Sequence, residues 1–307
     1  MYNVFVDGSA GTTGLKIVDR LSNRKDINLI ILPDEIRKDT LARKEALNSC
    51  DVAFLCLPDA AAIEAVSLVE NEKVKIIDTS TAHRVSDAWQ YGFAEINGFE
   101  QKIANHKRIA NPGCHASGFI SLVNPLINAS VLSEKAKLTC FSLTGYTGGG
   151  KKMIAEYEGE EKPVLYDAPR QYGLTQKHKH LPEMQKYCNL DFSPIFCPIV
   201  ADYDRGMEVT VPLFKDDIKC DINGLKEILK KAYEGSKVIK FVETDEGGFL
   251  SANSMKGKDS LEVSVFGNED RIILVSRFDN LGKGASGAAI QNMNILLGVE
   301  QTTGLIL

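Results

Sequence analysis

Short apolar runs alternate with segments of helical spacing through the N-terminal third of the chain. Helical spacing of apolar residues occurs over Thr12–Leu21 and Ala60–Val69. Apolar runs of this kind are strands buried on both faces, which is typical of a parallel sheet covered by helices. These repeated βα units predict a doubly wound α/β fold. The expected strands are Tyr2–Val6, Asn28–Leu32, Val52–Leu57 and Val74–Ile77.

The pattern changes after about residue 112, where longer strands appear with few helices between them. Helices are expected over Gly224–Tyr233 and, rich in small residues, over Ala285–Leu297. Strands in runs predict an α+β domain with a largely antiparallel sheet. We expect one domain over residues 1–112, completed by a C-terminal helix at 283–307, and a second over 113–282. The expected strands are Lys137–Leu143, Pro194–Ala201, Met207–Leu213, Leu261–Val265 and Arg271–Arg277.

Composition and charge narrow the class of protein. The 307 residues are 44% hydrophobic and 25% charged, with a net charge of −5, as in soluble globular proteins. So modest a charge gives no reason to expect nucleic acid or an acidic membrane surface as a partner. The start lacks the features of a signal peptide, and no apolar run could span a bilayer, so we expect a cytoplasmic protein. Seven cysteines without a CxxC pair indicate neither a disulfide framework nor a zinc site.

A glycine-rich turn joins the first strand to the first helix. Gly8, Gly11 and Gly14 are spaced GxxGxxG, with Thr12 and Thr13 at the expected helix start. Glycine permits a tight turn and lets the backbone approach a phosphate, which the N–H groups of the helix start then hold. The spacing differs from the commoner GxGxxG, and a plain turn is the alternative. The position before repeated βα units favours a Rossmann-type dinucleotide site.

The end of the second strand bears on the choice of dinucleotide. The sequence there includes Asp34, Glu35, Arg37 and Lys38. An acid at this position bonds the ribose 2′-hydroxyl of NAD, whereas a nearby arginine accepts the 2′-phosphate of NADP. Both residue types are present, and the acids could equally be solvated turn residues. Arg37 and Lys38 favour NADP slightly.

Cys114 alone among the seven cysteines has the setting of a reactive thiol. It follows Asn111-Pro112-Gly113 and lies at the start of a helical run from Ala116 to about Ile127. A helix N-terminus favours thiolate and therefore nucleophilicity. Most cysteines are small core residues, so the residues alone leave a reactive and a structural role open. The other six lie in apolar strands or near turns: Cys50, Cys56, Cys140, Cys188, Cys197 and Cys220.

A thiolate nucleophile needs a proton handler, and the chain has five histidines. His178 and His180 lie in a polar stretch far from Cys114 in sequence, whereas His115 adjoins it. Neighbouring positions on a helix point in different directions, which argues against His115. No third ligand lies at useful spacing from the histidine pair, so we expect no metal site.

Hydroxyls and cations could hold an anionic substrate. Ser80 and Arg84 follow the fourth strand, where parallel sheets bind ligands. A capping turn with a surface arginine is the alternative. The basic loop Gly145–Lys152 is expected to be flexible, either closing over an anion or only connecting two strands.

Five segments together resemble the short class of N-acetyl-γ-glutamyl-phosphate reductases, within the aspartate-semialdehyde dehydrogenase-like superfamily. They span nearly the whole chain in the family's order, and the NPGC and HxPE elements together are quite specific. The segments are Val6–Gly14, Asp78–Arg84, Asn111–Cys114, His180–Glu183 and Asn280–Gly287.

The resemblance implies a role for each matching position. Cys114 would attack an acyl carbonyl and form a thioester, and His180 would move protons at the tetrahedral stage. Arg84 would bind the phosphate of the substrate, with further substrate-binding positions at Ser80, Asn111 and Glu183. The implied cofactor-binding residues are Gly8, Gly11, Thr12, Thr13, Gly14, Gly284 and Ala285. Arg37 remains a cofactor-binding candidate from its position after the second strand, because the family match there does not fix the 2′-phosphate contact.

The implied activity is NADPH-dependent reduction of N-acetyl-L-glutamyl 5-phosphate to N-acetyl-L-glutamate 5-semialdehyde, with release of phosphate, in arginine biosynthesis. The resemblance also implies a homo-oligomer, either a dimer or a tetramer. Three alternatives stay open. The same chemistry could act on another acyl phosphate, such as aspartyl phosphate. Cys114 could be structural in an oxidoreductase without covalent catalysis, or the chain could be a non-catalytic dinucleotide-binding sensor.

Overall fold

The computed structural model describes residues 1–307, which form two compact units. Unit 1 comprises Met1–Pro112 and Ala285–Leu305, and unit 2 comprises Gly113–Gly284 with the last two residues. The chain therefore leaves unit 1, builds unit 2 and returns. None of its helices combines the length and the apolar character needed to cross a membrane.

Unit 1 contains a six-stranded sheet in the order β2-β1-β3-β4-β6-β5. Every neighbouring pair runs parallel; for example, Val4 of β1 pairs with Val52 of β3. The predicted parallel, doubly wound sheet is therefore confirmed. Its strands are β1 (Tyr2–Asp7), β2 (Ile27–Ile30), β3 (Val52–Leu55), β4 (Lys75–Asp78), β5 (Gln90–Tyr91) and β6 (Arg108–Ala110).

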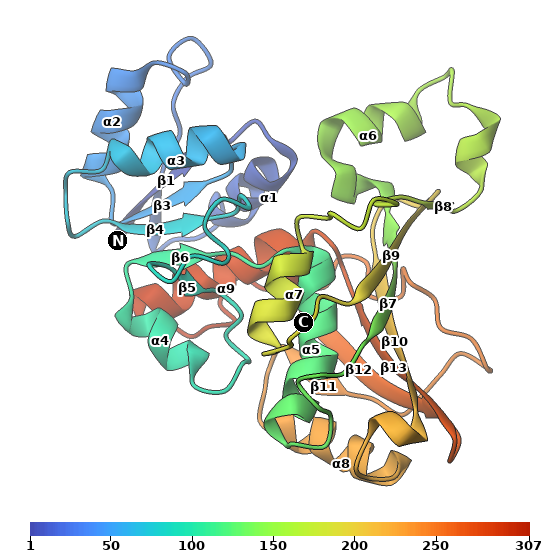
Figure 1. Ribbon diagram of the computed structural model, residues 1–307. Helices are drawn as coiled ribbons and strands as arrows, with labels where there is room; N and C mark the ends of the chain where they lie inside the picture. The colour runs from blue at the N-terminus through green and yellow to red at the C-terminus, as the bar shows by residue number, and fades with distance from the viewer. The chain divides into compact units, whose positions relative to one another are not determined.

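Helices cover both faces of this sheet (Figure 1). Alternate strand residues enter two separate cores: Val4 and Val6 pack with α1, α4 and α9, whereas Phe5 packs with α2 and α3. Helix α9 comes from the C-terminal segment, so unit 1 is discontinuous in sequence. The helices are α1 (Thr12–Leu21), α2 (Thr40–Ser49), α3 (Asp59–Ser67), α4 (Phe99–Asn105) and α9 (Gly287–Leu297).

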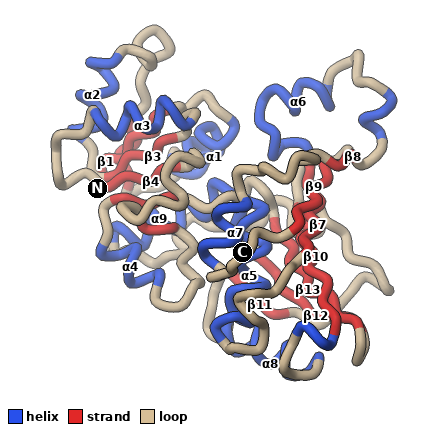
Figure 2. Tube along the Cα trace, in the orientation of Figure 1, coloured by secondary structure: helices blue, strands red, loops and turns tan.

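Unit 2 is built on a seven-stranded sheet in the order β11-β12-β13-β10-β7-β9-β8 (Figure 2). Only the β11–β12 and β7–β9 pairs are parallel. The expected α+β unit with a largely antiparallel sheet is thus confirmed. The strands are β7 (Thr139–Gly145), β8 (Arg170–Gln171), β9 (Ile195–Ala201), β10 (Met207–Phe214), β11 (Ile239–Phe241), β12 (Leu261–Gly267) and β13 (Arg271–Phe278).

Helices α5 (Cys114–Asn128) and α8 (Ile222–Ala232) pack against one face of this sheet, while α7 (Leu181–Tyr187) packs on α5. Several strand residues that point the other way stay accessible, although Val275 and Arg277 on that side are buried. Among the accessible residues, Phe141 is 40% exposed, Ile195 60%, Phe214 66% and Ile273 38%. We call the part of this side that carries these four exposed apolar residues the open face.

Two expectations differ from the structure. The segment Gly145–Lys152 is not a flexible loop, because Tyr146–Gly149 forms a 3-10 turn that leads into helix α6 (Gly150–Glu158). Hydrogen bonds from Thr147 Oγ1 to the Asp204 carbonyl and from Asn280 Nδ2 to Thr147 Oγ1 hold this turn. The expected C-terminal helix begins instead with a π-helical turn, Gly282–Ser286, before α9.

Candidate active site

The glycine turn of unit 1 is shaped by close backbone packing. Gly8 has φ +82°, and a Cβ there would lie 2.3 Å from the Cys56 carbonyl oxygen. A Cβ at Gly14 would lie 2.3 Å from the Gly8 carbonyl oxygen, so α1 crosses directly over the turn. The Gly11 N–H donates to that same carbonyl at 3.0 Å. Only glycine allows the backbone this conformation and proximity at Gly8.

Helix α1 begins with N–H groups that no side chain caps. Its N-cap is Gly11, which offers no side-chain oxygen, and its first turn contains no acid. Such a helix start favours an anion through its uncapped N–H groups and its dipole. Beside it lies a cavity of about 310 Å³ whose walls include Gly8, Ser9, Leu32, Arg37 and Lys38. These residues fit the phosphates and adenosine end of a dinucleotide.

Two arginines lie at this cavity in different settings. Arg37 Nε is paired with Asp34 Oδ1 at 3.1 Å, and Asp34 is largely exposed. Arg43 is buried, with its Nε 3.0 Å from Asp7 Oδ2 and its Nη1 3.0 Å from Glu64 Oε2. It thereby ties α2 and α3 to the end of β1. The sequence does not predict that Arg43 is buried, because a charged residue in a mostly polar helix is normally exposed to solvent.

The segment after β4 is a compact polar turn. Asp78 is fully buried and accepts hydrogen bonds from the Ser80 backbone N–H and from Ser80 Oγ at 2.9 and 2.8 Å. His83 Nδ1 lies 2.6 Å from the same carboxylate. Arg84 is 8% exposed, and its Nη2 donates to the Thr79 carbonyl at 3.0 Å. The Ser80 hydroxyl therefore caps the turn, the alternative raised from the sequence.

Asn111 joins the two parts of unit 1. Its Nδ2 donates to the Ala285 carbonyl at 3.0 Å, and its Oδ1 accepts from Asn292 Nδ2 at 3.1 Å. The side chain is 1% exposed. Its amide thus fixes the end of β6 to the returning C-terminal segment.

Cys114 is the first residue of α5 in unit 2. The N-cap is Gly113, which has no side-chain cap, and the first turn contains no acid. The Gly113 N–H instead donates to Glu183 Oε2 of α7 at 2.9 Å, and Glu183 is buried. The helix start therefore presents Cys114 in the setting that the sequence indicated.

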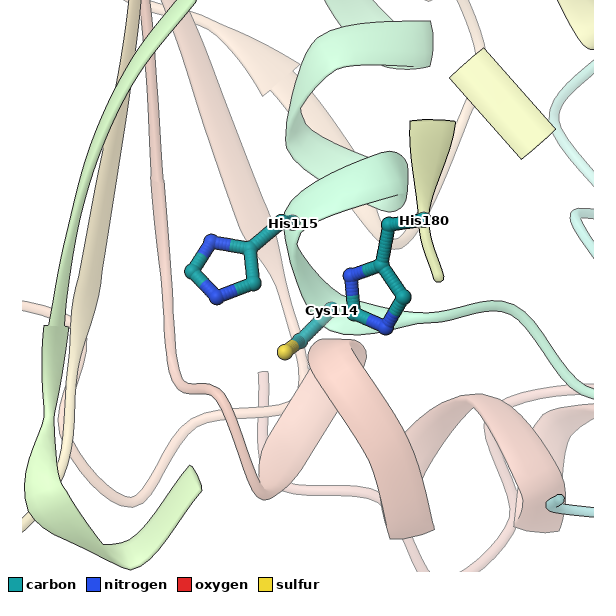
Figure 3. A group of neighbouring side chains, drawn as sticks. All are labelled: Cys114, His115 and His180. Atoms are coloured by element: carbon teal, nitrogen blue, oxygen red, sulfur yellow. The ribbon is translucent and has the colours of Figure 1, made fainter. Parts of the chain in front are cut away.

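Two histidines flank the cysteine (Figure 3). One ligand atom from each of Cys114, His115 and His180 lies within 4.8 Å of the other two. The structure thus brings His180 to Cys114 across 66 positions of sequence. The expectation that His115 points elsewhere is wrong, since its ring lies 5.4 Å from that of His180. The sequence spacing could not reveal this group, because Cys114 and His115 are adjacent on one helix and His180 is distant in sequence.

A hydrogen-bonded chain runs through His115. Its Nδ1 lies 2.6 Å from Ser142 Oγ, and its Nε2 lies 2.8 Å from the Tyr172 hydroxyl. Burial, helped by the charge of His178, lowers the pKa of His115 to about 3, so this imidazole is neutral near pH 7. Burial and then the negative charge of Cys114 raise the pKa of Tyr172 above its usual value. Nothing in the local sequence singles out Tyr172 or Ser142.

Gly284 packs against the cysteine. A Cβ at this position would lie 2.9 Å from the Cys114 Cβ and 3.2 Å from Phe278 Cε2. The π-helical turn Gly282–Ser286 brings it there. Any larger residue would displace the nucleophile.

Several other cysteines are buried thiols. Burial raises the pKa of Cys50 and of Cys56 to about 12, and it raises the pKa of Cys140 and Cys188 further. These thiols stay protonated near pH 7, which makes them poor nucleophiles.

Family models match both units. Residues 3–106 match the model described as semialdehyde dehydrogenase, NAD binding domain. Residues 114–280 match the model described as semialdehyde dehydrogenase, dimerisation domain.

Curated relatives match nearly the whole chain. The N-acetyl-gamma-glutamyl-phosphate reductase of Sinorhizobium medicae is 43% identical, covering 96% of this chain and 98% of its own. The reductase of Brucella ovis is 44% identical with the same coverage. N-acetyl-gamma-glutamyl-phosphate reductase 2 of a Nostoc species is 43% identical over 98% of each chain.

Solved structures share the fold at low identity. The aspartate semialdehyde dehydrogenase II of Vibrio cholerae, complexed with ASA, has a TM-score of 0.72 at 16% identity, over 97% of this chain and 98% of that chain. The enzyme of Francisella tularensis also has a TM-score of 0.72, at 12% identity, over 97% of this chain and 100% of that chain.

Proposed function

Because the chain belongs to the N-acetyl-gamma-glutamyl-phosphate reductase family of semialdehyde dehydrogenases, we propose that it reduces N-acetyl-L-glutamyl 5-phosphate to N-acetyl-L-glutamate 5-semialdehyde, with NADPH as reductant. The observation that carries the proposal is Cys114 at an uncapped helix start with His180 beside it. A thiol, an imidazole and an anion-binding turn are the parts that acyl-phosphate reduction requires.

Cys114 carries the acyl group. Its thiolate attacks the acyl carbonyl, the bond to phosphate breaks, and a thioester forms as inorganic phosphate leaves. The start of α5 stabilises the thiolate, because the positive end of the helix dipole lies at its first residue, Cys114. Glu183 is a positioning residue that holds Gly113, and so the helix start, through its carboxylate.

His180 moves the proton at the tetrahedral stage. Bound NADPH supplies the hydride that reduces the thioester carbonyl, and Gly8, Gly11, Gly14 and Arg37 would hold it with the threonines of the α1 start. His180 protonates the oxyanion that follows and withdraws that proton as the carbon–sulfur bond breaks. Aldehyde leaves, and Cys114 returns to its thiolate form.

The remaining matched positions serve the substrate and the cofactor. Arg84 binds the phosphate of the substrate. Its guanidinium is held in place by the hydrogen bond to the Thr79 carbonyl in the turn after β4, and a guanidinium binds phosphate well. Ser80 and Asn111 act by holding that turn and the end of β6 in place. Gly284 has no Cβ to crowd Cys114, and the family resemblance assigns Gly284 and Ala285 to the nicotinamide. Unit 1 is then the dinucleotide-binding domain and unit 2 the catalytic domain.

The open face of unit 2 supports self-association. It exposes Phe141, Ile195, Phe214 and Ile273, while α5 and α8 cover the opposite side. A second copy of the same sheet would bury these residues symmetrically, which is the commonest route to a homodimer. Unit 2 is also the part that matches the dimerisation-domain model.

The reaction is best tested in reverse, because the aldehyde is more stable than the acyl phosphate. The protein is mixed with N-acetylglutamate semialdehyde, phosphate and NADP, and reduced nicotinamide is followed by absorbance. Phosphate-dependent reduction that disappears in Cys114→Ala supports the proposal. Activity with aspartate semialdehyde alone would keep the chemistry and change the substrate, whereas dinucleotide binding without turnover on either aldehyde would contradict the enzyme.

A further inference from the structure

Cys114, His115 and His180 surround one point (Figure 3). Each offers one ligand atom, the cysteine Sγ or a ring nitrogen, and the three atoms lie within 4.8 Å of one another. Both imidazoles are buried and the cysteine is half-buried. A thiolate with two imidazoles is a soft ligand set that prefers zinc or cobalt over magnesium or calcium.

The spacing of the three atoms suits a tetrahedral ion. Zinc holds sulfur at about 2.3 Å and imidazole nitrogen at about 2.0–2.1 Å, which places neighbouring ligands about 3.5 Å apart. The donor atoms lie at most 4.8 Å apart, so an approach of about 1 Å closes the site. This approach requires the side chains of Cys114, the first residue of α5, and His180, the N-cap of α7, to rotate toward the ion. The fourth position is left for water or a substrate oxygen.

His115 is prepared for metal ligation by its own hydrogen bonds. Nδ1 lies 2.6 Å from Ser142 Oγ, and Nε2 lies 2.8 Å from the Tyr172 hydroxyl. With Nδ1–H donating to Ser142, the Nε2 lone pair accepts from the Tyr172 hydroxyl and is available to an ion that replaces it. A hydrogen bond on the second ring nitrogen is what fixes the tautomer and orientation of metal-ligating histidines.

We propose that Cys114, His115 and His180 form a reversible site for a thiophilic divalent cation, with zinc preferred, and that its occupancy switches the enzyme off. The bound ion takes the sulfur lone pair that attacks the acyl carbonyl and the His180 nitrogen that moves the proton. Inhibition rests on the function proposed above, but binding of the ion does not.

Cobalt(II) tests the binding without any turnover. Metal-stripped full-length protein is titrated with cobalt(II) alone, and its absorption spectrum is followed. We expect one equivalent to give the thiolate-to-cobalt charge-transfer band and the intense visible bands of tetrahedral coordination, both removed by one equivalent of zinc. Absence of the charge-transfer band in the wild-type protein would overturn the proposal.

Variants assign the ligands. Cys114→Ser should lose the charge-transfer band, and His115→Phe and His180→Asn should each weaken cobalt binding at least tenfold. Ser142→Ala keeps all three ligands and should weaken binding about 10–100-fold, because it removes the hydrogen bond that orients His115. Cys220→Ser and His106→Gln are matched controls outside the cluster and should keep the wild-type spectrum. Circular dichroism establishes that each variant is folded. A band that survives in Cys114→Ser, or unchanged affinity in both histidine variants, contradicts the site.

Activity provides the second readout. Zinc should inhibit semialdehyde oxidation, EDTA should restore it, and zinc affinity from inhibition should match that from cobalt competition. Normal turnover in a protein that does not bind cobalt would contradict the metal site and would leave the proposed function intact. A full cobalt spectrum in a protein that turns over no semialdehyde supports the site and contradicts the function.

Discussion

At the scale of single residues, the setting of a side chain decides its chemistry more than its type does. Seven cysteines share one thiol chemistry, yet burial holds Cys50 and Cys56 protonated, whereas Cys114 is the first residue of a helix whose N-cap is a glycine. Glu183 completes that setting by binding the Gly113 N–H. Replacement of each such residue therefore has a distinct expected outcome.

Cys114→Ser should lower turnover by about 10³-fold or more, because serine at this position lacks the acidity and leaving ability that the thioester needs. NADP binding should stay nearly unchanged, since the residues expected to hold its phosphates belong to unit 1 and Cys114 is not among them. Steady-state semialdehyde oxidation and fluorescence titration with NADP measure the two quantities. Cys220→Ser is the control and should keep wild-type turnover; normal turnover in Cys114→Ser would refute the covalent mechanism.

Gly284→Ala should impair catalysis without removing any functional group. The added Cβ meets the Cys114 Cβ at 2.9 Å, so the nucleophile must move. A displacement approaching 1 Å costs about 100-fold in rate. Gly148→Ala is the matched control, because its nearest atom, Thr144 Oγ1, is 3.4 Å away and needs little movement. Equal kcat for Gly284→Ala and the wild type would show that the contact does not position the sulfur.

At the scale of elements, the strength of the apolar pattern determined what the sequence could predict. Helix α1 has the predicted bounds, Thr12–Leu21, because apolar residues line one side of it. Helix α2 (Thr40–Ser49) was not predicted, since most of its residues are polar and its packing depends on Arg43 reaching Asp7. The glycines of Gly145–Lys152 predict a flexible loop, but the segment is ordered by tertiary hydrogen bonds, which a sequence pattern does not show.

The same reasoning separates the parts of the candidate site. A turn and a helix start are local, so the glycine motif and the setting of Cys114 were visible in sequence. The chain from Ser142 through His115 to Tyr172 joins a strand, a helix and a loop. Contacts of that kind leave no periodic signal in the sequence. The family resemblance, and not any sequence spacing, predicts that His180 is the residue that moves the proton.

The turn between β1 and α1 should be intolerant of a methyl group. Gly8→Ala adds a Cβ 2.3 Å from a backbone oxygen at φ +82°, which costs stability and closes the cavity beside α1. Gly98→Ala is the matched control, with φ +75° and no atom within 4 Å. In each variant, the left-handed conformation of the alanine lowers the free energy of unfolding by about 1–2 kcal/mol. Only Gly8→Ala should lose more stability than this, and only Gly8→Ala should lose NADP binding.

Urea unfolding followed by circular dichroism gives the two free energies of unfolding, and isothermal titration gives the NADP affinity. If both alanine variants lose the same stability and Gly8→Ala still binds NADP as tightly as the wild type, then the turn does not hold the cofactor.

At the scale of the whole molecule, the open face of unit 2 predicts self-association. Phe141→Asp places a charge on that face, where a second copy would bury it, and burial of an unpaired charge is strongly unfavourable. Sedimentation velocity should show a monomer or a dimer weakened at least about tenfold, which corresponds to about 1.4 kcal/mol. Leu41→Asp, on an exposed position of α2, is the control and should leave the association unchanged. A stable dimer in Phe141→Asp would place the interface elsewhere.

The return of the chain to unit 1 also sets an order of events during synthesis. Helix α9 contributes Ala289, Ile290 and Met293 to the core around β1, yet it is synthesised only after the whole of Gly113–Gly284. At about 5–20 residues per second, the first 112 residues wait roughly ten to thirty-five seconds for it. During that interval the sheet of unit 1 has one apolar side incomplete. Nearly all of unit 2 emerges before α9 and can fold first, so a nascent chain released early would be a target for chaperones and proteases rather than a partly active enzyme.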